Sequence, residues 1–539
     1  MAVCALGIAH ADISKISPDL HASLATPGQS VDVIVQYAST PSSCSSGLLG
    51  AVLCVPVNLL GGVLNSVLTL VNAVTATLPA GNLLALSEQP NVTYISPDRH
   101  VVTMSNATAS NATADLEAAT TNAPVAWSSG WIGAGVGVAV IDSGIYAHPD
   151  LNGRVVYHQS FVGGKLTDDF GHGTHVAGIL AGVNGVAPQA NLLDLRVLDV
   201  SGVSNDSAVI AALQTAVSLK SKYNVRVVNL SLGRPIYETC NLDPLCLAVE
   251  NTYRSGIVVV AAAGNLGRNG YGTILSPGNS PHAITVGAMK SEGTPSRSDD
   301  LIASYSSRGP SYIDQTVKPD LVAPGNLVVS CLAPGSTLVN DYPANVVAPN
   351  HFILSGTSMA TPAVSAAAAI LIQKDPTLTP DTVKARLMKT ASKSFPVSST
   401  AVDPTTGLKY TDEYDVFTIG AGYLDIASAV SNYDVTSKSS ASPASLYNMF
   451  TRQASFVFLP GETWGSTPAW TPALVWGTTV VSGTNYNLWN ASNAWTGSAG
   501  WGTNVAWGSN VAWGSNVAWG SNVAWGTNVA WGTSGVGEQ

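Results

Sequence analysis

From residue 136 onward, short apolar runs alternate with longer segments whose apolar residues recur at helical spacing. The apolar runs predict strands at 136–141, 192–198, 225–230 and 257–262. The spaced patterns predict helices at 174–181, 206–220, 244–254, 363–373 and 381–390. Strands that are apolar along their whole length are typical of a parallel sheet covered by helices on both faces. The pattern therefore predicts an α/β domain with a mostly parallel central sheet, closed by residues 419–431.

The first hundred residues predict a smaller α+β unit. Strands are expected at 31–37, 69–78 and 92–95, with a helix at 80–88. Residues 47–68 are uncharged and mostly apolar, and their number would suffice to cross a membrane. Because Pro, Asn and Gly interrupt this stretch and its leucines fall roughly on one helical face, an amphipathic hairpin or helix is the favoured interpretation.

Three segments have no core pattern. Residues 1–11 resemble the apolar end of a signal peptide, with Ala9-His10-Ala11 as its cleavage site, although the positively charged start is missing. A disordered N-terminus is the alternative. Residues 105–125 begin with a run rich in Ser, Ala, Thr and Asn and predict an exposed linker of the kind that proteases cut. Residues 434–463 are polar and contain Pro, which predicts a second linker.

The remaining residues, 464–539, form a tail in which tryptophan is concentrated. It holds 11 of the 13 Trp residues, and its end repeats a six-residue unit that restarts at Trp501, Trp507, Trp513, Trp519, Trp525 and Trp531. Gly-Ser/Thr-Asn is turn chemistry and Val-Ala-Trp a short strand, so a β-type repeat is expected. So short a unit must stack to bury a face. A small β-solenoid, an edge that pairs with another surface and a low-complexity tail all remain open.

Charge and cysteine content narrow the class of protein. Only 10% of residues are charged and the net charge is −10, which argues against nucleic acid as a partner because no basic stripe is present. The six cysteines are too few for a disulfide-rich scaffold. Cys240 and Cys246 lie close enough in sequence for a local bridge outside the cytosol, and buried thiols are the alternative.

A candidate nucleophile lies in the block Ser355-Gly-Thr-Ser-Met-Ala-Thr-Pro362, which is followed by an Ala-rich run. Pro362 fits the first turn of a helix, so Ser358 is expected at or next to a helix N-terminus. Unpaired backbone N–H groups at such an end can stabilise an oxyanion. An ordinary Ser/Thr cap before a core helix is the alternative.

Two further blocks supply the partners that such a serine needs. Asp142 follows an apolar strand, at the edge where α/β sheets place their sites. The block Gly171-His-Gly-Thr-His175 puts two imidazoles at the opening of a helix. A carboxylate, an imidazole and a hydroxyl are the parts of a nucleophilic triad. Composition alone does not choose between His172 and His175.

These three blocks, in the order Asp, His, Ser, resemble the subtilisin-like serine proteases over residues 126–433. The resemblance implies a subtilisin-like three-layer fold, with Asp142 as the orienting acid, His172 as the general base and Ser358 as the nucleophile. It also implies that His175 is a packed helix residue. The resemblance further implies peptide hydrolysis through an acyl-enzyme.

The same resemblance extends to substrate binding. Asn265, in the block Ala-Ala-Ala-Gly-Asn, looks like the family's oxyanion donor, paired with the backbone N–H of Ser358. Substrate would pair as an added strand. The residues implied in substrate binding are Ser231, Leu232, Gly233, Ala261, Ala262 and Gly264.

Residues 72–102 resemble the propeptide of this family, which implies that 12–104 form an intramolecular chaperone and inhibitor. Chemistry of this type requires no cofactor. The block His148-Pro-Asp-Leu151 resembles one that helps to bind a structural calcium, but the partner loop at 181–188 is short. Because calcium needs six to eight oxygen ligands, no metal is assigned there; a calcium elsewhere remains open.

Together these features predict a secreted or cell-surface serine endopeptidase, made as a self-processing zymogen and acting on polypeptides. Its own propeptide would be its inhibitor. The alternative is a surface or adhesion protein that uses the repeat tail, with the protease domain as a scaffold. In either case the tail is expected to self-associate or to attach to a surface.

Overall fold

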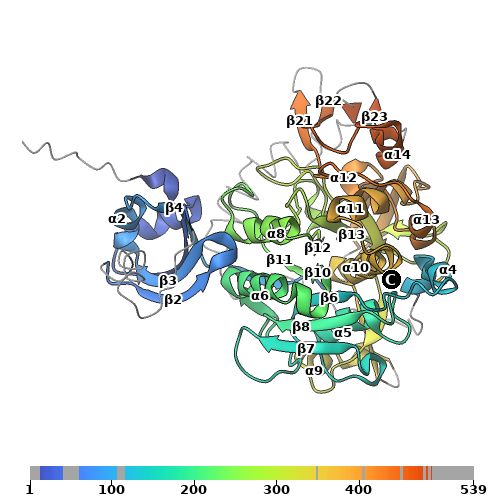
Figure 1. Cartoon of the computed structure of the whole chain (residues 1–539), viewed down its shortest axis with the longest axis horizontal. Coiled ribbons are helices and arrows are strands. Elements are labelled where there is room, and N and C mark those ends of the chain that lie inside the picture. The colour runs from blue at the N-terminus through green and yellow to red at the C-terminus, as the bar shows by residue number, and fades with distance from the viewer. Residues whose placement is uncertain are drawn as a thin grey trace, which may run out of the picture.

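The computed structural model describes residues 12–39, 57, 60–105, 116–347, 350–403, 407–448, 453–477, 481–482 and 487–488. The expected signal remnant at 1–11 and the hexapeptide repeat that begins at Trp501 therefore lie outside the described residues. So does most of the apolar stretch at 47–68. Figure 1 shows the smaller N-terminal unit, in blue, beside a larger body that holds the rest of the described chain.

An eight-stranded sheet forms the centre of the larger body. Its order is β14-β13-β12-β10-β6-β8-β7, and β15 pairs with β13. Every pairing in it is parallel except that between β13 and β14. The strands are β6 (Gly137–Asp142), β7 (Val155–Ser160), β8 (Asn191–Arg196), β10 (Val225–Leu230), β12 (Val258–Ala262), β13 (Ile284–Lys290), β14 (Leu301–Ile302) and β15 (Leu321–Pro324). The mostly parallel sheet expected from the sequence is thus confirmed.

Helices cover both faces of this sheet, because its strands are apolar on both. Along β6, Val138 and Val140 pack into the core under α5 (His172–Ala181) and α10 (Thr357–Lys374). Ala139 and Ile141 point the other way, into the core under α6 (Asp206–Ser218) and α8 (Pro244–Arg254). This alternation is the two-residue period of a strand, and it produces three layers.

Shorter elements complete the described chain. The helices are α3 (Glu117–Thr120), α4 (Ala123–Trp127), α7 (Lys220–Tyr223), α9 (Thr337–Asp341), α11 (Pro380–Thr390), α12 (Val416–Ile419), α13 (Ile426–Ser431) and α14 (Pro472–Trp476). The strands are β5 (His100–Thr103), β9 (Val203–Asn205), β11 (Leu232–Gly233), β16 (Val328–Cys331), β17 (Val346–Val347), β18 (His351–Leu354), β19 (Ser398–Val402), β20 (Lys409–Glu413), β21 (Ala444–Asn448), β22 (Gln453–Val457), β23 (Val481–Ser482) and β24 (Asn487–Leu488). Single 3₁₀ turns include η3 (Thr69–Val71) and η5 (Pro149–Leu151).

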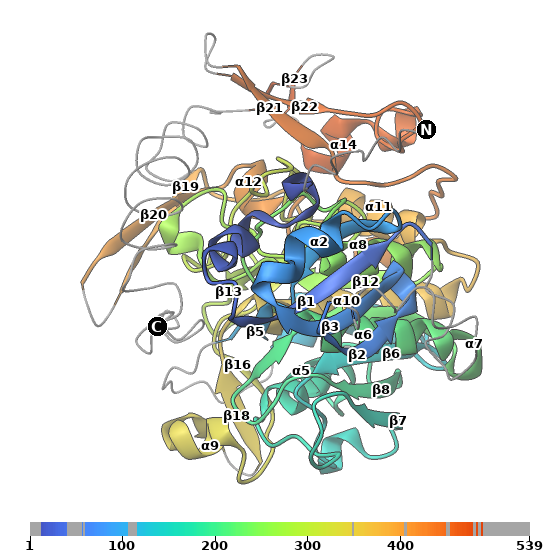
Figure 2. The same cartoon turned by 90° about the vertical axis from the view of Figure 1, so that its left-hand side faces the viewer.

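The N-terminal unit is an antiparallel sheet of order β2-β3-β1-β4 with the short helix α2 (Leu83–Ser87). Its strands are β1 (Ser30–Tyr37), β2 (Val63–Leu68), β3 (Ala73–Pro79) and β4 (Val92–Pro97). Val33 and Val35 pack into the unit's own core, whereas Ile34 packs with the core of α6 and α8. One face of the small sheet therefore lies on these two helices, as Figure 2 shows from the side of the N-terminal unit.

Of the two interpretations of the apolar stretch at 47–68, a hairpin or a helix, its described end agrees with the hairpin. Residues Val63–Leu68 form the edge strand β2, paired with β3. Within the described ranges of the chain, no helix is long and apolar enough to cross a membrane. Pairing with β3 gives the backbone N–H and C=O groups of β2 hydrogen-bond partners. The leucine spacing does not reveal this pairing.

Both expected linkers contain packed structure. Residues Glu117–Thr120 and Ala123–Trp127 are helices, and Ala118 and Ala123 belong to the main core. The larger body therefore begins before residue 126. Between 434 and 463, β21 pairs with β22, and Phe456 is buried in the same core. Both segments are rich in small polar residues, so the sequence shows no core pattern there. Their few apolar side chains pack against elements that lie far away along the chain.

The start of the Trp-rich tail also belongs to the larger body. Trp464, Trp470 and Trp476 are buried in the main core. The Trp470 ring packs under the Lys389 ammonium, 5.1 Å from the ring centroid, and α14 lies against α11. The boundary expected at residue 464 is therefore corrected, because residues 464–476 pack against the sheet domain.

Of the two alternatives for Cys240 and Cys246, the disulfide is formed. It closes a short turn that leads into α8, whose N-terminus is capped by the Asp243 carboxylate. Cys4, Cys44 and Cys54 lie outside the described residues.

Replacing Trp470 with Ala should lower the free energy of unfolding of the full chain by about 3–5 kcal/mol, because a large buried ring leaves a cavity. The control is Leu474→Ala on the neighbouring helix α14, whose side chain is 49% exposed and should change stability by less than about 0.5 kcal/mol. Chemical denaturation followed by tryptophan fluorescence measures both. Equal effects of the two substitutions would contradict the packed tail start.

Candidate active site

The site is a cleft between two strands of the larger body, and the chain's own residues 100–105 lie in it. Strand β5 is the middle of a three-stranded antiparallel sheet of order β11-β5-β9. Thr103 pairs with Leu232 on one side, and Val102 pairs with Val203 on the other. The expected edge at Leu232 and Gly233 therefore does bind an extended chain, and that chain comes from the N-terminal unit. The opposite edge, β9, had not been expected.

Ser358 is the second residue of α10, as its predicted place at a helix N-terminus requires. The expectation for Pro362 is corrected, because the helix begins at Thr357 and Pro362 lies inside it. A proline at this position cannot donate to the carbonyl of Ser358, four residues earlier. That carbonyl accepts a hydrogen bond from Ser231 Oγ instead, at 3.0 Å. This hydrogen bond joins α10 to Ser231, the residue before β11, beside the candidate nucleophile.

Three hydrogen bonds join Ser358 to the cleft and to Met104. Ser358 Oγ donates to the carbonyl of Ser231 at 2.9 Å and accepts from the backbone N–H of Met104 at 3.1 Å. The backbone N–H of Ser358 donates to the carbonyl of Met104 at 3.2 Å. The peptide unit that follows Met104 therefore lies directly at the N-terminus of α10.

His172 and Asp142 form a buried pair at the carboxyl end of β6. The Nδ1 atom of His172 lies 2.7 Å from Oδ1 of Asp142, and each side chain is at most 1% exposed. With its Nδ1–H donated to the carboxylate, the ring carries a lone pair on Nε2. That Nε2 atom is buried and has no hydrogen-bond partner within the described part of the chain. The pair can therefore accept a proton at Nε2, whereas the Ser358 hydroxyl is bonded to Ser231 and Met104 in this structure.

His175 is not part of this pair. Its Nε2 atom lies 3.0 Å from the carbonyl of Phe352, within the core beneath α5. Burial, with a smaller effect from His172, lowers the pKa of His175 to about 3, so the ring is neutral. Of the two candidate imidazoles, His172 is the one that contacts Asp142.

Asp168 supports the helix that carries His172, and sequence reasoning missed it. Its carboxylate accepts from the backbone N–H groups of Gly171 and Thr174 and from the hydroxyls of Thr174 and Ser143. Burial raises the pKa of this carboxyl above its ordinary value. An acidic residue just before a helix N-terminus is the signal that could have pointed to it.

Asn265 lies where a second hydrogen-bond donor is expected. Its Oδ1 accepts from the backbone N–H and the hydroxyl of Thr357, each at 3.0 Å, which fixes the orientation of the amide. Its Nδ2 is buried without a hydrogen-bond partner in the described structure. A side chain at Gly356 would collide with the carbonyl of Met104 and come within 3.0 Å of Asn265 Nδ2. Gly356 thus leaves room for that carbonyl beside the amide.

The Met104 side chain occupies a small apolar pocket. It packs with Ala262 and Leu275 in a cluster separate from the main core. Gly264 closes the pocket, since an added Cβ there would lie 2.7 Å from Leu275 Cγ. Ala261, which precedes Ala262 on β12, packs its side chain into the opposite core, so any contact that it makes with substrate would be through its backbone. Leu275 follows no motif and had not been expected.

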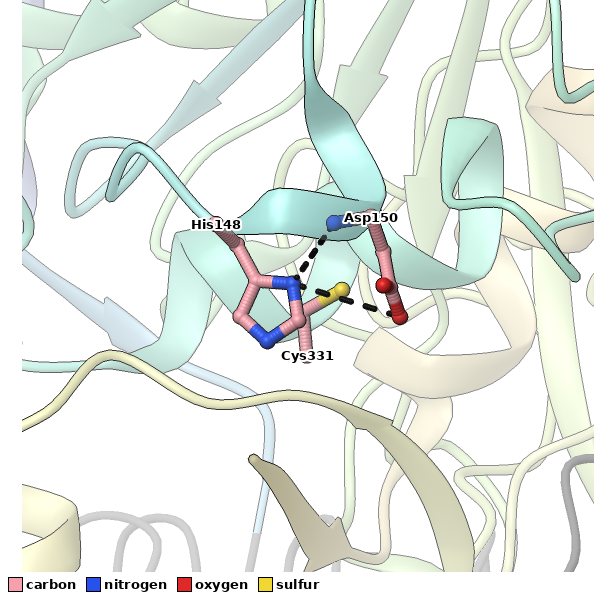
Figure 3. A group of neighbouring side chains, drawn as sticks. All are labelled: His148, Asp150 and Cys331. Carbon is pink, nitrogen blue, oxygen red and sulfur yellow. Dashed lines mark hydrogen bonds and ion pairs between the residues drawn. The ribbon is translucent and has the colours of Figure 1, made fainter. Parts of the chain in front are cut away.

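The residues around Asp150 do not fit a calcium ion. One carboxylate oxygen of Asp150 lies 3.1 Å from His351 Nε2 and 4.0 Å from His148 Nδ1, and Cys331 lies beside them (Figure 3). These neighbours offer nitrogen and sulfur, whereas calcium takes six to eight oxygens. The loop at 181–188 contains a tight turn closed by a hydrogen bond from Gly185 N–H to the carbonyl of Gly182. The described residues around Asp150 therefore do not supply the oxygen ligands of a calcium site.

Comparisons with known proteins match this architecture. A family model described as the subtilase family matches residues 133–422. The serine protease AprX of Bacillus subtilis (strain 168) is 40% identical over 280 residues, which are 48% of this chain and 62% of AprX. Subtilisin E of the same organism is 36% identical over 343 residues, 62% of this chain and 78% of subtilisin E.

Among solved structures, fervidolysin from Fervidobacterium pennivorans, described as a keratinolytic enzyme related to subtilisin, has a similar fold. The TM-score is 0.57 and the identity 20%, over 76% of this chain and 62% of fervidolysin. At this identity the likeness concerns the fold alone.

Proposed function

The chain belongs to the subtilase family of serine endopeptidases, and from this premise we propose that it is a zymogen whose first substrate is its own Met104–Ser105 bond. The observation that carries the proposal is the placement of Met104. Its carbonyl accepts a hydrogen bond from the backbone N–H of Ser358, and its side chain fills the apolar pocket. A product-like or substrate-like chain would be held in this way.

In the first step, Ser358 Oγ turns from the carbonyl of Ser231 toward His172 and attacks the carbonyl carbon of Met104. His172 Nε2 takes the hydroxyl proton as general base. Asp142 holds the ring through Nδ1, which keeps the lone pair on Nε2 and stabilises the imidazolium that forms. The negative charge that develops on the Met104 oxygen is stabilised by the N–H of Ser358 and by Asn265 Nδ2.

In the second step, the bond between the Met104 carbonyl carbon and the Ser105 nitrogen breaks. His172 returns its proton to that nitrogen, which leaves as the new amino terminus. Met104 remains as an ester on Ser358 Oγ until water, deprotonated by His172, hydrolyses it and restores the hydroxyl. Polypeptide substrates would follow the same two steps after pairing with β11 and β9.

The N-terminal unit has contacts that would keep it bound after cleavage. Asp98 accepts from the backbone N–H and the hydroxyl of Ser207, at the N-terminus of α6. Arg99 is buried and donates to Glu238 at 2.7 Å and to Asp19 at 2.8 Å. With the packing of the small sheet on α6 and α8, these contacts support residues 12–104 as an inhibitor and folding partner. The cut would fall at the start of the expected linker 105–125.

The pocket also supports a preference at the residue before the cleaved bond. Ala262 and Leu275 offer apolar contact to Met104. An apolar side chain without a branch at Cβ, such as Met or Leu, fits such a pocket, whereas a charged one would lose its hydration there without gaining a partner. We therefore propose cleavage after medium-sized apolar residues.

Export from the cytosol is part of the proposal, because the Cys240–Cys246 disulfide persists in oxidising compartments. The alternative role, adhesion through the repeat tail, gains no support from the described residues. It would rest on the repeat from Trp501 onward, which lies outside them.

Replacing Ser358 with Ala should abolish peptide hydrolysis and leave residues 12–104 covalently attached, because no hydroxyl remains to attack the Met104 carbonyl. The measurements are casein hydrolysis and the chain length on a denaturing gel. Ser365→Ala is a matched control, a buried serine on the same helix that bonds Asn229 and not Met104. Self-processing by the Ser358 variant at the parent rate would refute the assignment.

Amino-terminal sequencing of the processed protein should read Ser105 as its first residue. Met104→Asp should slow processing at least about 100-fold, because the pocket would desolvate the carboxylate, and Met104→Leu should process at close to the parent rate. The fraction of cleaved chain against time measures both variants. Cleavage elsewhere in 105–125, or equal rates for the Asp and Leu variants, would refute this bond as the maturation site.

A further inference from the structure

We propose that His148, Asp150, Cys331 and His351 form a binding site for Zn²⁺, separate from the residues of peptide hydrolysis. The first three bring one ligand atom each within 4.8 Å of one another (Figure 3). They come from two distant parts of the chain. His148 and Asp150 flank the start of η5, and Cys331 ends β16.

His148 is already oriented as a metal ligand would be. Its Nε2 lies 2.9 Å from the carbonyl of Asn350, which makes Nε2 the protonated nitrogen and leaves the lone pair on Nδ1. Nδ1 faces Asp150, whose nearer carboxylate oxygen is 4.0 Å away. A backbone carbonyl that fixes the tautomer of a ligating histidine is the usual outer contact of a zinc site. The N–H of Asp150 donates to Nδ1 at 3.1 Å, and a bound ion would replace this hydrogen bond.

His351 completes the set as a fourth ligand. It lies directly opposite Cys331 in the antiparallel pair of β16 and β18, so the two side chains share one face of the hairpin. Its Nε2 lies 3.1 Å from a carboxylate oxygen of Asp150, and its ring centroid is 5.7 Å from that of His148. The group of His148, Asp150 and Cys331 therefore has a second imidazole in contact with its carboxylate, and the ion would take that imidazole as its fourth ligand.

The donor chemistry selects the ion. Two imidazoles, one thiolate and one carboxylate suit Zn²⁺, which prefers four ligands in a tetrahedron, and they do not suit Ca²⁺. Zinc–ligand bonds of about 2.0–2.3 Å require ligand atoms roughly 3.3–3.8 Å apart. The distances of 3.1 and 4.0 Å to Asp150 bracket that range. On binding, Cys331 would release its thiol proton to solvent.

Burial and access are both suitable. The side chains of His148 and Cys331 are almost completely buried, which would protect the zinc–nitrogen and zinc–sulfur bonds. Those of Asp150 and His351 are 29% and 25% exposed, so an ion can enter from solvent on their side. A site that is closed by four protein ligands is structural rather than catalytic.

The ion would join η5 to the antiparallel pair of β16 and β18, which contacts α5, the helix that carries His172. Cys331 lies against α5, since an added Cβ at Gly178 would come 2.7 Å from its sulfur. Ser330, the preceding residue, donates its hydroxyl to the carbonyl of His175 at 2.8 Å. Zinc would therefore stabilise the part of the sheet domain on which α5 rests.

The test uses the full chain with Ser358→Ala, so that binding is measured without self-cleavage. After incubation with Zn²⁺ and buffer exchange, the protein should retain about one zinc per chain, and its thermal unfolding midpoint should rise with zinc concentration. Co²⁺ in place of Zn²⁺ should give the absorption of a thiolate-bound tetrahedral ion. A large excess of Ca²⁺ should not displace the zinc.

Single substitutions in the same background locate the site. Cys331→Ser should abolish the thiolate–cobalt absorption, and both Cys331→Ser and His351→Ala should lower zinc affinity by roughly 100-fold or more. His158→Ala is the matched control, a half-exposed histidine paired with Asp194, and should bind zinc as the parent does.

His351→Ala keeps the test decisive if the buried Cys331→Ser variant fails to fold, which circular dichroism would reveal. The proposal is overturned if the parent retains no zinc after buffer exchange, if His351→Ala binds zinc with unchanged affinity, or if Ca²⁺ displaces the zinc. None of these outcomes depends on proteolytic activity.

Discussion

The pairing of β5 between β9 and β11 is the interaction on which the candidate active site depends. Backbone hydrogen bonds on both edges fix the path of residues His100–Thr103. Met104 follows at once, so its carbonyl reaches the N–H of Ser358 and its side chain reaches Ala262 and Leu275. The N-terminal unit, held on α6 and α8, delivers this strand to the cleft without a search through solution, which lowers the entropic cost of binding.

Burial determines how the three proposed catalytic side chains are arranged. His172 and Asp142 are almost completely shielded from water, and the lone pair on His172 Nε2 has no partner within the described ranges. Ser358 is meanwhile bonded to Ser231 and Met104. In the proposed mechanism, the Ser358 hydroxyl leaves these partners before it gives its proton to His172. Pro362 contributes, because the carbonyl it leaves unpaired in α10 is bound by the Ser231 hydroxyl.

Much of this could be predicted from the sequence, because the parallel strands carry unbroken apolar runs and the site residues stand in short blocks. Long-range packing was out of reach. Leu275 and Asp168 act through contacts with distant or differently patterned segments, and Trp470 was assigned to a tail because its core partners lie far along the chain. The helix α10, which contains Pro362, begins earlier than the proline predicts. This is possible because the Ser231 hydroxyl donates to the Ser358 carbonyl, which has no helical partner.

The central claim is that the Met104–Ser105 bond is cut by Ser358 of the same chain. The most direct test measures the rate of that cleavage by mass spectrometry after refolding, at protein concentrations that span about two orders of magnitude. Collisions between chains become rarer as the protein is diluted, whereas contacts within one chain do not. The account predicts a first-order rate constant that does not change with concentration. A rate constant that rises in proportion to concentration would show cleavage between chains and would contradict it.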